Sequence, residues 1–456
     1  MIKSHVFLHI SILFSSLFST AASGQDFIPH TRLTHHWEFS KGDLGGVWEA
    51  LRSDSLSGNL PEWKTIDIPH CFNAYDSVDP DMPYYQGPAW YRTQLTIDNP
   101  HPNGRTLLHF EGVSQKTEVY INTEIVGSHS GGYDEFTIDI TDAVNRYKRL
   151  SDFISGSKDR ISKKGTIPLV IRCDNSRDLE MIPSNLSDFN LYGGLYRYVN
   201  LVYEPAISLD RIHLQTERQS DGTWRILSQG RLHNPQLSKD SVSLDIQILQ
   251  PNGQSIYHSQ KILNPWDNMA PLFEYAIQNP ILWSPDSPEL YQCIVSLETK
   301  EGKSSIQESF GLRWFEFKEN GPFFLNGKQL FLRGTHRHED FAGLAAAIPE
   351  ELIVKEIQMI KDMGANFIRL GHYQQSRIVL ESCNKLGILV WEEIPWCRGG
   401  LGGKRYQQQA RDMLRAMIDQ HFNHPSVMIW GLGNENDWPG DFEQFNKDEI
   451  RTFMQN

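Results

Sequence analysis

Four short apolar segments in the last third of the chain are each followed by a cluster of polar side chains. They are residues 330–335, 367–370, 388–391 and 427–430. Helical patterns separate them, and this alternation of strand and helix is typical of a parallel sheet covered by helices. Because parallel strands end on one face, we expect the polar clusters to meet there. The pattern predicts the first half of a (β/α)8 TIM barrel over residues 313–456, with a doubly wound sheet as the alternative.

The expected helices of this region have recognisable ends. The first begins at Pro349 and ends at Gly364, the second ends at Gly387, and the third includes residues 410–417. We find neither a G-x-G-x-x-G motif after a strand nor a G-x-x-x-x-G-K-[ST] motif, so nucleotide chemistry has no support.

The preceding residues read as β-structure. Residues 25–205 contain short alternating runs divided by Gly, Pro, Asn and Asp, and residues 206–312 continue with strands. The second stretch has the length of one immunoglobulin-like sandwich. The predicted fold class is therefore multidomain β plus α/β, with two β-sandwiches before the partial barrel.

The N-terminus has the pattern of a secretory signal peptide over residues 1–24. Lys3 supplies a positive charge, residues 6–22 are mostly apolar, and Ala22-Ser23-Gly24 offers a cleavage site. This predicts export to the periplasm or medium. The alternative is an N-terminal membrane anchor, for which the apolar stretch is short.

Composition narrows the choice of partners. The net charge of −13 argues against a nucleic-acid binder or a protein that adheres to anionic membranes. The aromatic content of 11% fits either an aromatic-rich β core or a sugar-binding surface. The five cysteines include no C-x-x-C pair, so we expect buried free thiols, no zinc ribbon and no cofactor.

Glu435, which closely follows the fourth apolar segment, is the strongest candidate for chemistry. A partly buried carboxyl there would act as a general acid, and Asn434 would orient a substrate hydroxyl beside it. The competing interpretation is that Glu435 caps the next helix. The residues alone favour neither.

Other polar residues near the strand ends are also ambiguous. His336, His338 and His372 would either bind zinc, donate hydrogen bonds to substrate hydroxyls, or serve structure only. Glu393 would hold Arg369 or Arg337 and so support the site without touching substrate. We predict no metal among these residues.

Several motifs resemble those of glycoside hydrolase family 2, which includes β-galactosidases, β-glucuronidases and β-mannosidases. The barrel motifs are Phe324-Leu-Asn-Gly-Lys328, Leu332-Arg-Gly-Thr-His-Arg-His-Glu-Asp340, Ala365-Asn-Phe-Ile-Arg-Leu-Gly-His-Tyr373, Leu386-Gly-Ile-Leu-Val-Trp-Glu-Glu393 and Gly431-Leu-Gly-Asn-Glu435. The N-terminal motifs are Trp90-Tyr-Arg92, Phe110-Glu-Gly-Val113, Gly131-Gly-Tyr-Asp-Glu-Phe136 and Gly193-Gly-Leu-Tyr-Arg197. Together they extend from about residue 30 to the end.

The resemblance implies a sugar-binding jelly roll, an immunoglobulin-like domain and a catalytic barrel that cleaves terminal β-glycosides with retention. It makes Glu435 the acid/base and Asn434 a ligand of the sugar 2-hydroxyl. It also gives His338, His372 and Asp188 contacts to the sugar. The substrate would be the end of a β-linked oligosaccharide or polysaccharide, and a homo-oligomer is among the expected states of the full-length protein.

Residues 372–375 and 390–395 look most like β-galactosidases, so we expect a terminal β-D-galactoside as substrate. The alternatives are a β-glucuronidase or β-mannosidase of the same family, a non-catalytic carbohydrate-binding protein, and a metallohydrolase that uses the three histidines. Glu435 beside Asn434 argues against the non-catalytic protein, and the metallohydrolase would show chelator-sensitive activity.

Two departures from the family pattern affect these expectations. Residues 394–397 lack the carboxylate that binds magnesium in metal-dependent galactosidases. In this family the nucleophilic glutamate comes from a later strand, and neither Glu443 nor Glu449 follows an apolar strand. We therefore expect a fragment of a longer protein that is inactive alone, with the nucleophile and the residues that read a glucuronate carboxylate lying beyond Asn456.

Overall fold

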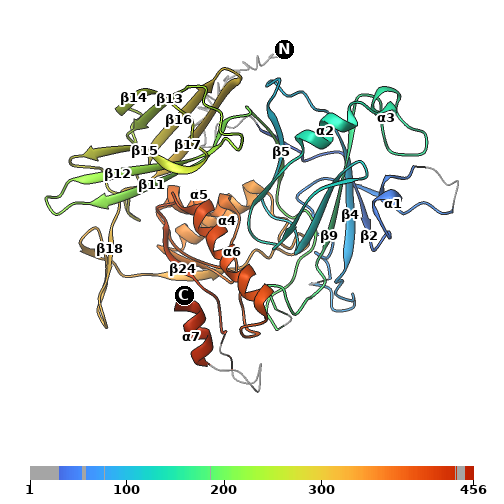
Figure 1. Ribbon diagram of the computed structural model, residues 1–456. Coiled ribbons are helices and arrows are strands. Elements are labelled where there is room, and N and C mark those ends of the chain that lie inside the picture. The colour runs from blue at the N-terminus through green and yellow to red at the C-terminus, as the bar shows by residue number, and fades with distance from the viewer. Residues whose placement is uncertain are drawn as a thin grey trace, which may run out of the picture.

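A computed structural model describes residues 30–53, 58–76, 78–184, 186–436, 438 and 447–455. The predicted signal peptide over residues 1–24 lies outside this described part. Within it, we find no helix whose length and hydrophobicity would suit a membrane crossing. Figure 1 shows two β-sandwiches, with the helix-containing C-terminal segment against both.

The N-terminal domain is a sandwich of two antiparallel sheets. One sheet has the strand order β1 (His30–Arg32), β10 (Val199–Glu204), β5 (Arg105–Phe110) and β8 (Phe136–Asp139). The other has the order β3 (Lys64–Ile66), β2 (Trp37–Lys41), β4 (Pro88–Leu95), β9 (Ile167–Asp174), β6 (Lys116–Ile121) and β7 (Glu124–Ser130). Helices α1 (Val47–Leu51), α2 (Thr141–Tyr147) and α3 (Ser151–Ser155) lie in the connections.

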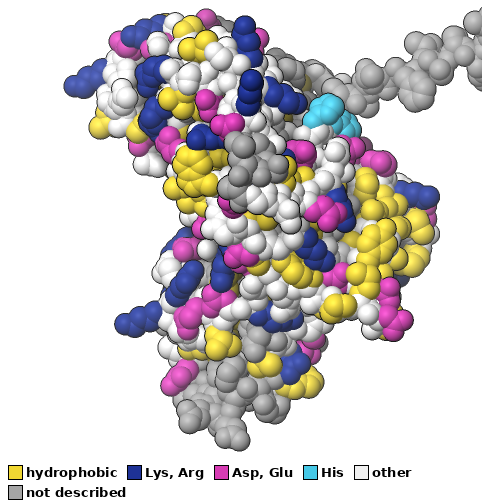
Figure 2. All heavy atoms as spheres, turned by 90° about the vertical axis from the view of Figure 1, so that its right-hand side faces the viewer, with side chains coloured by type: hydrophobic (Ala, Val, Ile, Leu, Met, Phe, Trp, Pro, Cys, Tyr) yellow, Lys and Arg dark blue, Asp and Glu magenta, His cyan; other side chains and the backbone are white. Residues whose placement is uncertain are grey.

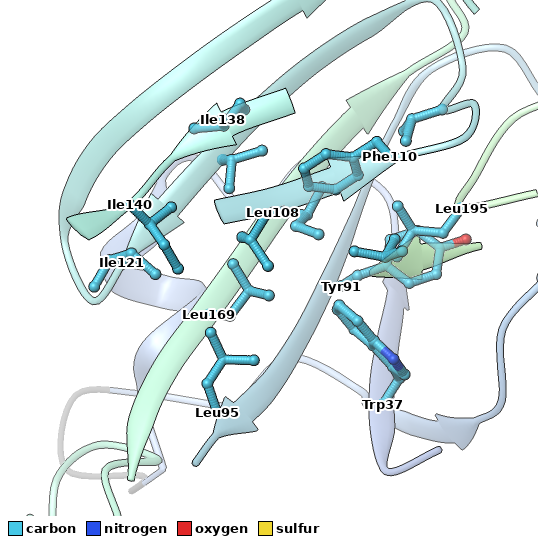
Figure 3. Packing of buried hydrophobic residues seen from close by; sticks show 14 of the residues in the cluster. Trp37, Tyr91, Leu95, Leu108, Phe110, Ile121, Ile138, Ile140, Leu169 and Leu195 are labelled. Atoms are coloured by element: carbon cyan, nitrogen blue, oxygen red, sulfur yellow. The ribbon is translucent and has the colours of Figure 1, made fainter. Parts of the chain in front are cut away.

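The core of this sandwich follows from the alternation of side chains along its strands. On β5, Leu108 and Phe110 point inward and are fully buried, and they meet Tyr91 and Leu169 from the second sheet (Figure 3). The intervening residues of β5, such as Leu107 and His109, face the other way, toward the neighbouring domains.

The second domain is a sandwich of a three-stranded and a four-stranded sheet. The first has the order β11 (Ser208–Arg218), β12 (Trp224–His233) and β15 (Asn268–Ile277). The second has the order β14 (Ser255–Leu263), β13 (Val242–Leu249), β16 (Tyr291–Thr299) and β17 (Gly302–Phe310). Trp224, Ile246 and Val295 are among its buried core residues. This arrangement matches the predicted immunoglobulin-like sandwich.

The third region begins with the small sheet β18 (Phe315–Phe317), β19 (Phe323–Leu325) and β20 (Lys328–Gln329). A parallel sheet follows, in the order β21 (Gly334–Arg337), β22 (Phe367–Leu370), β23 (Leu389–Glu393) and β24 (Val427–Gly431). The helices are α4 (Glu350–Asp362), α5 (Arg377–Leu386), α6 (Lys404–His421) and α7 (Lys447–Gln455). Sequential parallel strands with crossover helices form the expected partial barrel rather than a doubly wound sheet.

Local sequence signals set the ends of α5. The Ser376 side chain accepts a hydrogen bond from the backbone N–H of Ile378, and Gly387 ends the helix in the left-handed conformation at φ 67°. The apolar face of this helix, with Val379 and Leu380, packs on the sheet in the same core as Ile357 of α4. The helices predicted from residues 349–364, 379–387 and 410–417 are confirmed.

The predicted first barrel strand was wrong in position. Residues 330–333 form no strand, and pairing with β22 begins at Gly334. Leu330 and Leu332 instead pack in a cluster that joins Trp283 of the preceding domain to Leu389 and Met428 of the barrel strands. Their apolar character therefore serves an interdomain contact that resembles a buried strand in sequence.

Figure 2 shows the face of the molecule on the side of the N-terminal sandwich. Basic and acidic side chains are interspersed over the described part of this face, and neither sign forms a continuous field. Such a mixed surface produces little long-range attraction for a polyanion.

Candidate active site

Glu393, at the end of β23, is the centre of a polar network at the carboxyl ends of the barrel strands. Its side chain is 0% exposed, and its two oxygens accept hydrogen bonds from Arg369 at 2.9 and 3.0 Å. His372 Nδ1 lies 2.5 Å from Glu393 Oε1. Glu393 thus holds Arg369 of the neighbouring strand, whereas Arg337 pairs with Glu356 on α4.

The network continues to Asn434 and from there to the N-terminal domain. Arg369 Nη2 donates to Asn434 Oδ1 at 3.0 Å, and Asn434 Nδ2 lies 3.5 Å from Cys397 Sγ. The Cys397 thiol in turn donates to Asp188 Oδ1 at 3.2 Å. Burial raises the pKa of this thiol to about 12, so it keeps its proton at neutral pH. Asp188 therefore reaches the strand ends from the jelly roll, and its contact with the sugar stays a prediction.

His338 lies at the other side of this cluster. Its ring is 5.3 Å from that of His372 and 6.3 Å from that of Phe189, which follows Asp188 in the jelly-roll loop. Burial lowers the pKa of His338, and the nearby His372 lowers it further, against a smaller opposing effect of Asp340 and Asp188. His338 is thus predominantly neutral at pH 7, with one ring nitrogen able to accept and the other able to donate.

Glu435 stands apart from this network. Its backbone has a φ of 50° and its side chain is exposed to solvent, immediately after the anchored Asn434. Its predicted role as acid/base stays a prediction, as do the sugar contacts of the two histidines. The nearest described helix after it is α7, which begins at Lys447.

His336 is exposed, and its ring lies 6.4 Å from that of His372. In the described ranges we find no group of three or more His, Cys, Asp or Glu side chains arranged to hold a metal ion. We therefore assign the three histidines no shared ligand.

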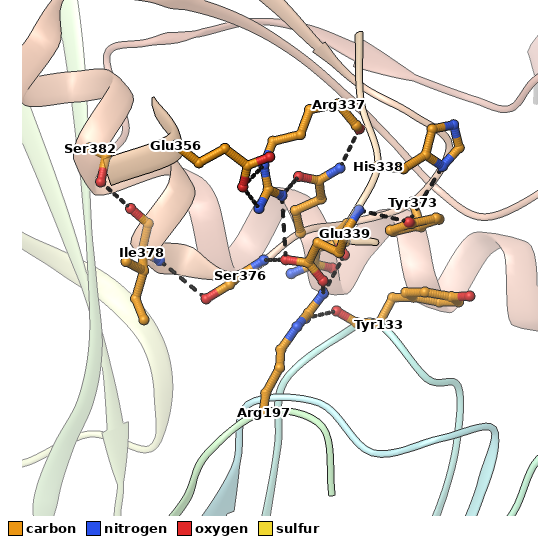
Figure 4. A network of polar contacts seen from close by, with 12 residues as sticks. Tyr133, Arg197, Arg337, His338, Glu339, Glu356, Tyr373, Ser376, Ile378 and Ser382 are labelled. Atoms are coloured by element: carbon orange, nitrogen blue, oxygen red, sulfur yellow. Dashed lines mark hydrogen bonds and ion pairs between the residues drawn. The ribbon is translucent and has the colours of Figure 1, made fainter. Parts of the chain in front are cut away.

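A buried arginine from the jelly roll fixes the loops that carry these residues (Figure 4). Arg197 Nη2 donates to Glu339 Oε2 and to the Gln374 carbonyl, both at 2.8 Å. Its Nη1 donates to the carbonyls of Tyr133 and Glu111. Since Glu339 follows His338 and Gln374 closely follows His372, one side chain ties both histidine loops to the jelly roll.

Reasoning from sequence missed three residues of this site: Cys397, Phe189 and Arg197. Cys397 lies in the segment that attracted notice only because it lacks a carboxylate, and Phe189 directly follows Asp188. Arg197 closes the motif that begins at Gly193, so its place in a family motif was the available signal. The sequence did not indicate that Arg197 pairs with Glu339 of another domain.

Three family models match consecutive parts of the chain. They are described as glycosyl hydrolases family 2, sugar binding domain, over residues 32–205; glycosyl hydrolases family 2 over residues 207–313; and glycosyl hydrolases family 2, TIM barrel domain, over residues 316–453. The chain belongs to glycoside hydrolase family 2. The predicted family and the three-part fold class are thereby confirmed.

The chain is similar to several proteins of this family. It is 52% identical to the β-glucuronidase of Parabacteroides merdae, whose structure it matches with a TM-score of 0.88 over 93% of this chain and 53% of that one. It is 51% identical to Bacteroides uniformis β-glucuronidase 3, with a TM-score of 0.86 over 93% and 53% of the two chains. A putative β-glucuronidase of Formosa agariphila is 39% identical over 91% of this chain and 48% of its own length. The chain thus spans about half the length of these relatives.

The predicted preference for galactosides is wrong. The relatives named β-galactosidase are less similar, such as that of Thermoanaerobacter pseudethanolicus at 27% identity over 87% of this chain and 50% of its own length. The structure explains why residues 374 and 375 were a poor guide to the substrate. Gln374 and Gln375 are 3% and 1% exposed, and their side-chain amides bond Gln420 and Arg337. They support the scaffold and do not report the identity of a sugar.

Proposed function

We propose that the full-length protein containing this chain is an exo-acting, retaining β-glucuronidase that acts on the end of a carbohydrate chain or conjugate. The observation that carries the proposal is the anchored Asn434 beside Glu435 at the strand ends, in a chain 52% identical to a β-glucuronidase. Buried Glu393 fixes Arg369, and Arg369 fixes Asn434, so the amide is oriented before any sugar arrives.

In this proposal, Glu435 protonates the leaving oxygen and later activates water. Asn434 Oδ1 is occupied by Arg369, and its amide nitrogen faces only the weak acceptor Cys397 Sγ. The nitrogen therefore keeps an N–H for the sugar 2-hydroxyl. His338, His372 and Asp188 are proposed to contact the terminal sugar. We assign no nucleophile within this chain.

The substrate is tested with the full-length protein and matched chromogenic β-glucuronide, β-galactoside and β-mannoside. We expect the glucuronide to have the highest kcat/KM by at least about tenfold, which corresponds to about 1.4 kcal/mol in the transition state. A galactoside or mannoside that reacts equally well would contradict the proposal.

The role of Glu435 is tested with Glu435→Gln and two glucuronides that differ in leaving group. An alkyl glucuronide needs protonation of its leaving oxygen, whereas a nitrophenyl glucuronide does not, so the first should lose at least about a hundredfold in kcat/KM, which reports the step that breaks the glycosidic bond, and the second much less. Glu449→Gln, at an exposed position on α7, is the matched control and should react normally. Full activity of Glu435→Gln on the alkyl glucuronide would remove Glu435 from the mechanism.

A further inference from the structure

A second cavity lies where the three domains meet. Its volume is about 410 Å³, and its floor is the outer face of β5 and β10 in the jelly roll. Asp210 and Arg211 of the immunoglobulin-like domain and Glu350 of α4 are among its wall residues. None of the side chains of the Glu393 network, Arg369, His372, Asn434, Cys397 and Asp188, lines it. Its volume is within the range of ligand pockets, which often form at domain junctions.

One end of the floor has buried polar atoms without protein partners. Glu111 and Asn200 are 5% and 3% exposed, and Asn200 Nδ2 donates to Glu111 Oε1 at 3.0 Å. Glu111 Oε2 and Asn200 Oδ1 remain without a hydrogen bond, as does the N–H of Arg32 Nε nearby. All three residues line the cavity. Two acceptors and one donor are thus held at this end, and burial makes their lack of partners unfavourable.

The opposite end of the cavity floor also has donor and acceptor groups. Glu204 is 4% exposed, and its neighbour across the sheet, Arg105, has an unpaired Nε–H. Burial raises the pKa of Glu204 to about 8, so its carboxyl is mostly protonated at neutral pH and both donates and accepts. Between the two ends, Val202 and Leu107 pair across the strands and form an apolar strip.

We propose that this interdomain cavity binds a small neutral sugar, a mono- or disaccharide, outside the candidate active site. A hydroxyl group donates and accepts, so a sugar satisfies the unpaired donor and acceptors of Arg32, Glu111 and Asn200 at one end and the unpaired Nε–H of Arg105 at the other. Its C–H faces fit the strip of Val202 and Leu107. An amine or metal cation would pair with the acceptors only, and it would approach the guanidinium groups of Arg32 and Arg105.

The test measures binding of cellobiose and glucose to the whole chain by calorimetry, because binding requires no turnover. Val202→Phe fills the floor of the cavity, whereas Ile262→Phe makes a comparable change at a side chain that is 81% exposed on β14. Asn434→Ala removes the candidate active-site amide. We expect Val202→Phe to weaken binding at least about tenfold, with the other two variants within about twofold of the parent.

Asn200→Ala provides a second variant that removes an unpaired acceptor without filling space. It should also weaken binding, and circular dichroism of both cavity variants checks that they fold. The proposal is overturned if neither sugar binds at about 10 mM, if binding is lost in Asn434→Ala and kept in Val202→Phe, or if putrescine or calcium occupies the cavity in place of sugar. Since the readout is binding to the cavity variants, the result is independent of whether the full-length protein cleaves glucuronides.

Discussion

The barrel segment contacts the jelly roll and the immunoglobulin-like domain through ion pairs of almost equal length and very different surroundings. Arg197 lies 2.8 Å from Glu339, with side chains 5% and 3% exposed. Arg231 of β12 lies 2.7 Å from Asp419 of α6, with side chains 38% and 25% exposed. The first pair lies under the candidate active site and the second at the periphery.

The difference in burial shows that the distance between two charged groups does not by itself indicate how much the ion pair contributes to stability. Arg197 makes hydrogen bonds to three backbone carbonyls besides Glu339 through its two terminal nitrogens, and its Nε has no partner. Removing it would leave the Glu339 carboxylate desolvated beside the sheet. Water can replace either partner of the Asp419 pair, and salt screens it. The buried contact should therefore be the one that fixes the site.

The largest predicted effect comes from Arg197→Met. It should destabilise the contact between the jelly roll and the barrel by about 3–5 kcal/mol, because Glu339 loses its nearer buried countercharge and keeps only Arg337, at 4.0 Å. Hydrogen exchange of residues 338–340 and 372–376 measures this locally. Adding Glu339→Gln to Arg197→Met should restore part of the loss. Unchanged exchange in Arg197→Met would show that this buried pair does not hold the histidine loops.

The peripheral contact should be less sensitive. Asp419→Asn removes the charge that faces Arg231, Arg211 and His213, and we expect a loss of about 1 kcal/mol, near the upper end for exposed pairs. Urea unfolding at low and high salt measures it, and about 1 M NaCl should reduce the difference. An effect as large as that of Arg197→Met would remove the distinction between the two contacts.

Residues with a local pattern were predictable in this fold. Helix α5 has its cap at Ser376 and its end at Gly387, and β22 ends where its apolar run ends. The first strand was misplaced because Leu330 and Leu332 pack in a cluster that includes Trp283, about fifty residues earlier in sequence. An apolar run in sequence does not distinguish a sheet neighbour from a domain neighbour.

In the candidate active site, too, local contacts were predictable from the sequence and contacts between domains were not. Glu393 was predicted to hold Arg369 or Arg337 because of its place at the strand ends, and the structure pairs it with Arg369. The thiol that joins Asp188 to Asn434, and the arginine that joins Glu339 to the jelly roll, depend on packing between domains. Residues 372–375 resembled β-galactosidases in sequence, and only the hydrogen bond from Gln375 to the Arg337 carbonyl shows that this side chain faces the scaffold.

Lowering the pH tests the contribution of the peripheral Asp419 contact to stability. Burial alone would raise the pKa of Asp419, but the hydrogen bond from His213 and the charges of Arg211 and Arg231 lower it well below the ordinary value. A lowered carboxyl pKa stabilises the fold above the unfolded value of about 4, and the contribution is lost as pH falls below it. The gap between the parent and Asp419→Asn, measured by thermal unfolding, should therefore shrink from pH 5 towards pH 2. A constant gap would contradict the assignment.

The smallest predicted effect is that of Arg231→Lys, which keeps the positive charge but loses the paired hydrogen bonds to Asp419. Arg231 donates to both oxygens of Asp419, at 2.7 and 3.1 Å, in a planar arrangement that an ammonium group cannot reproduce. We expect a loss of about 0.5 kcal/mol at this partly exposed site.

Arg197→Lys makes the same change in the buried contact. There the four acceptors of Arg197 would be only partly satisfied, so this variant should lose several times more stability. Urea unfolding of the two lysine variants side by side gives this ratio. Equal losses would mean that charge alone, and not burial with directed hydrogen bonds, separates the contact beneath the site from the one at the periphery.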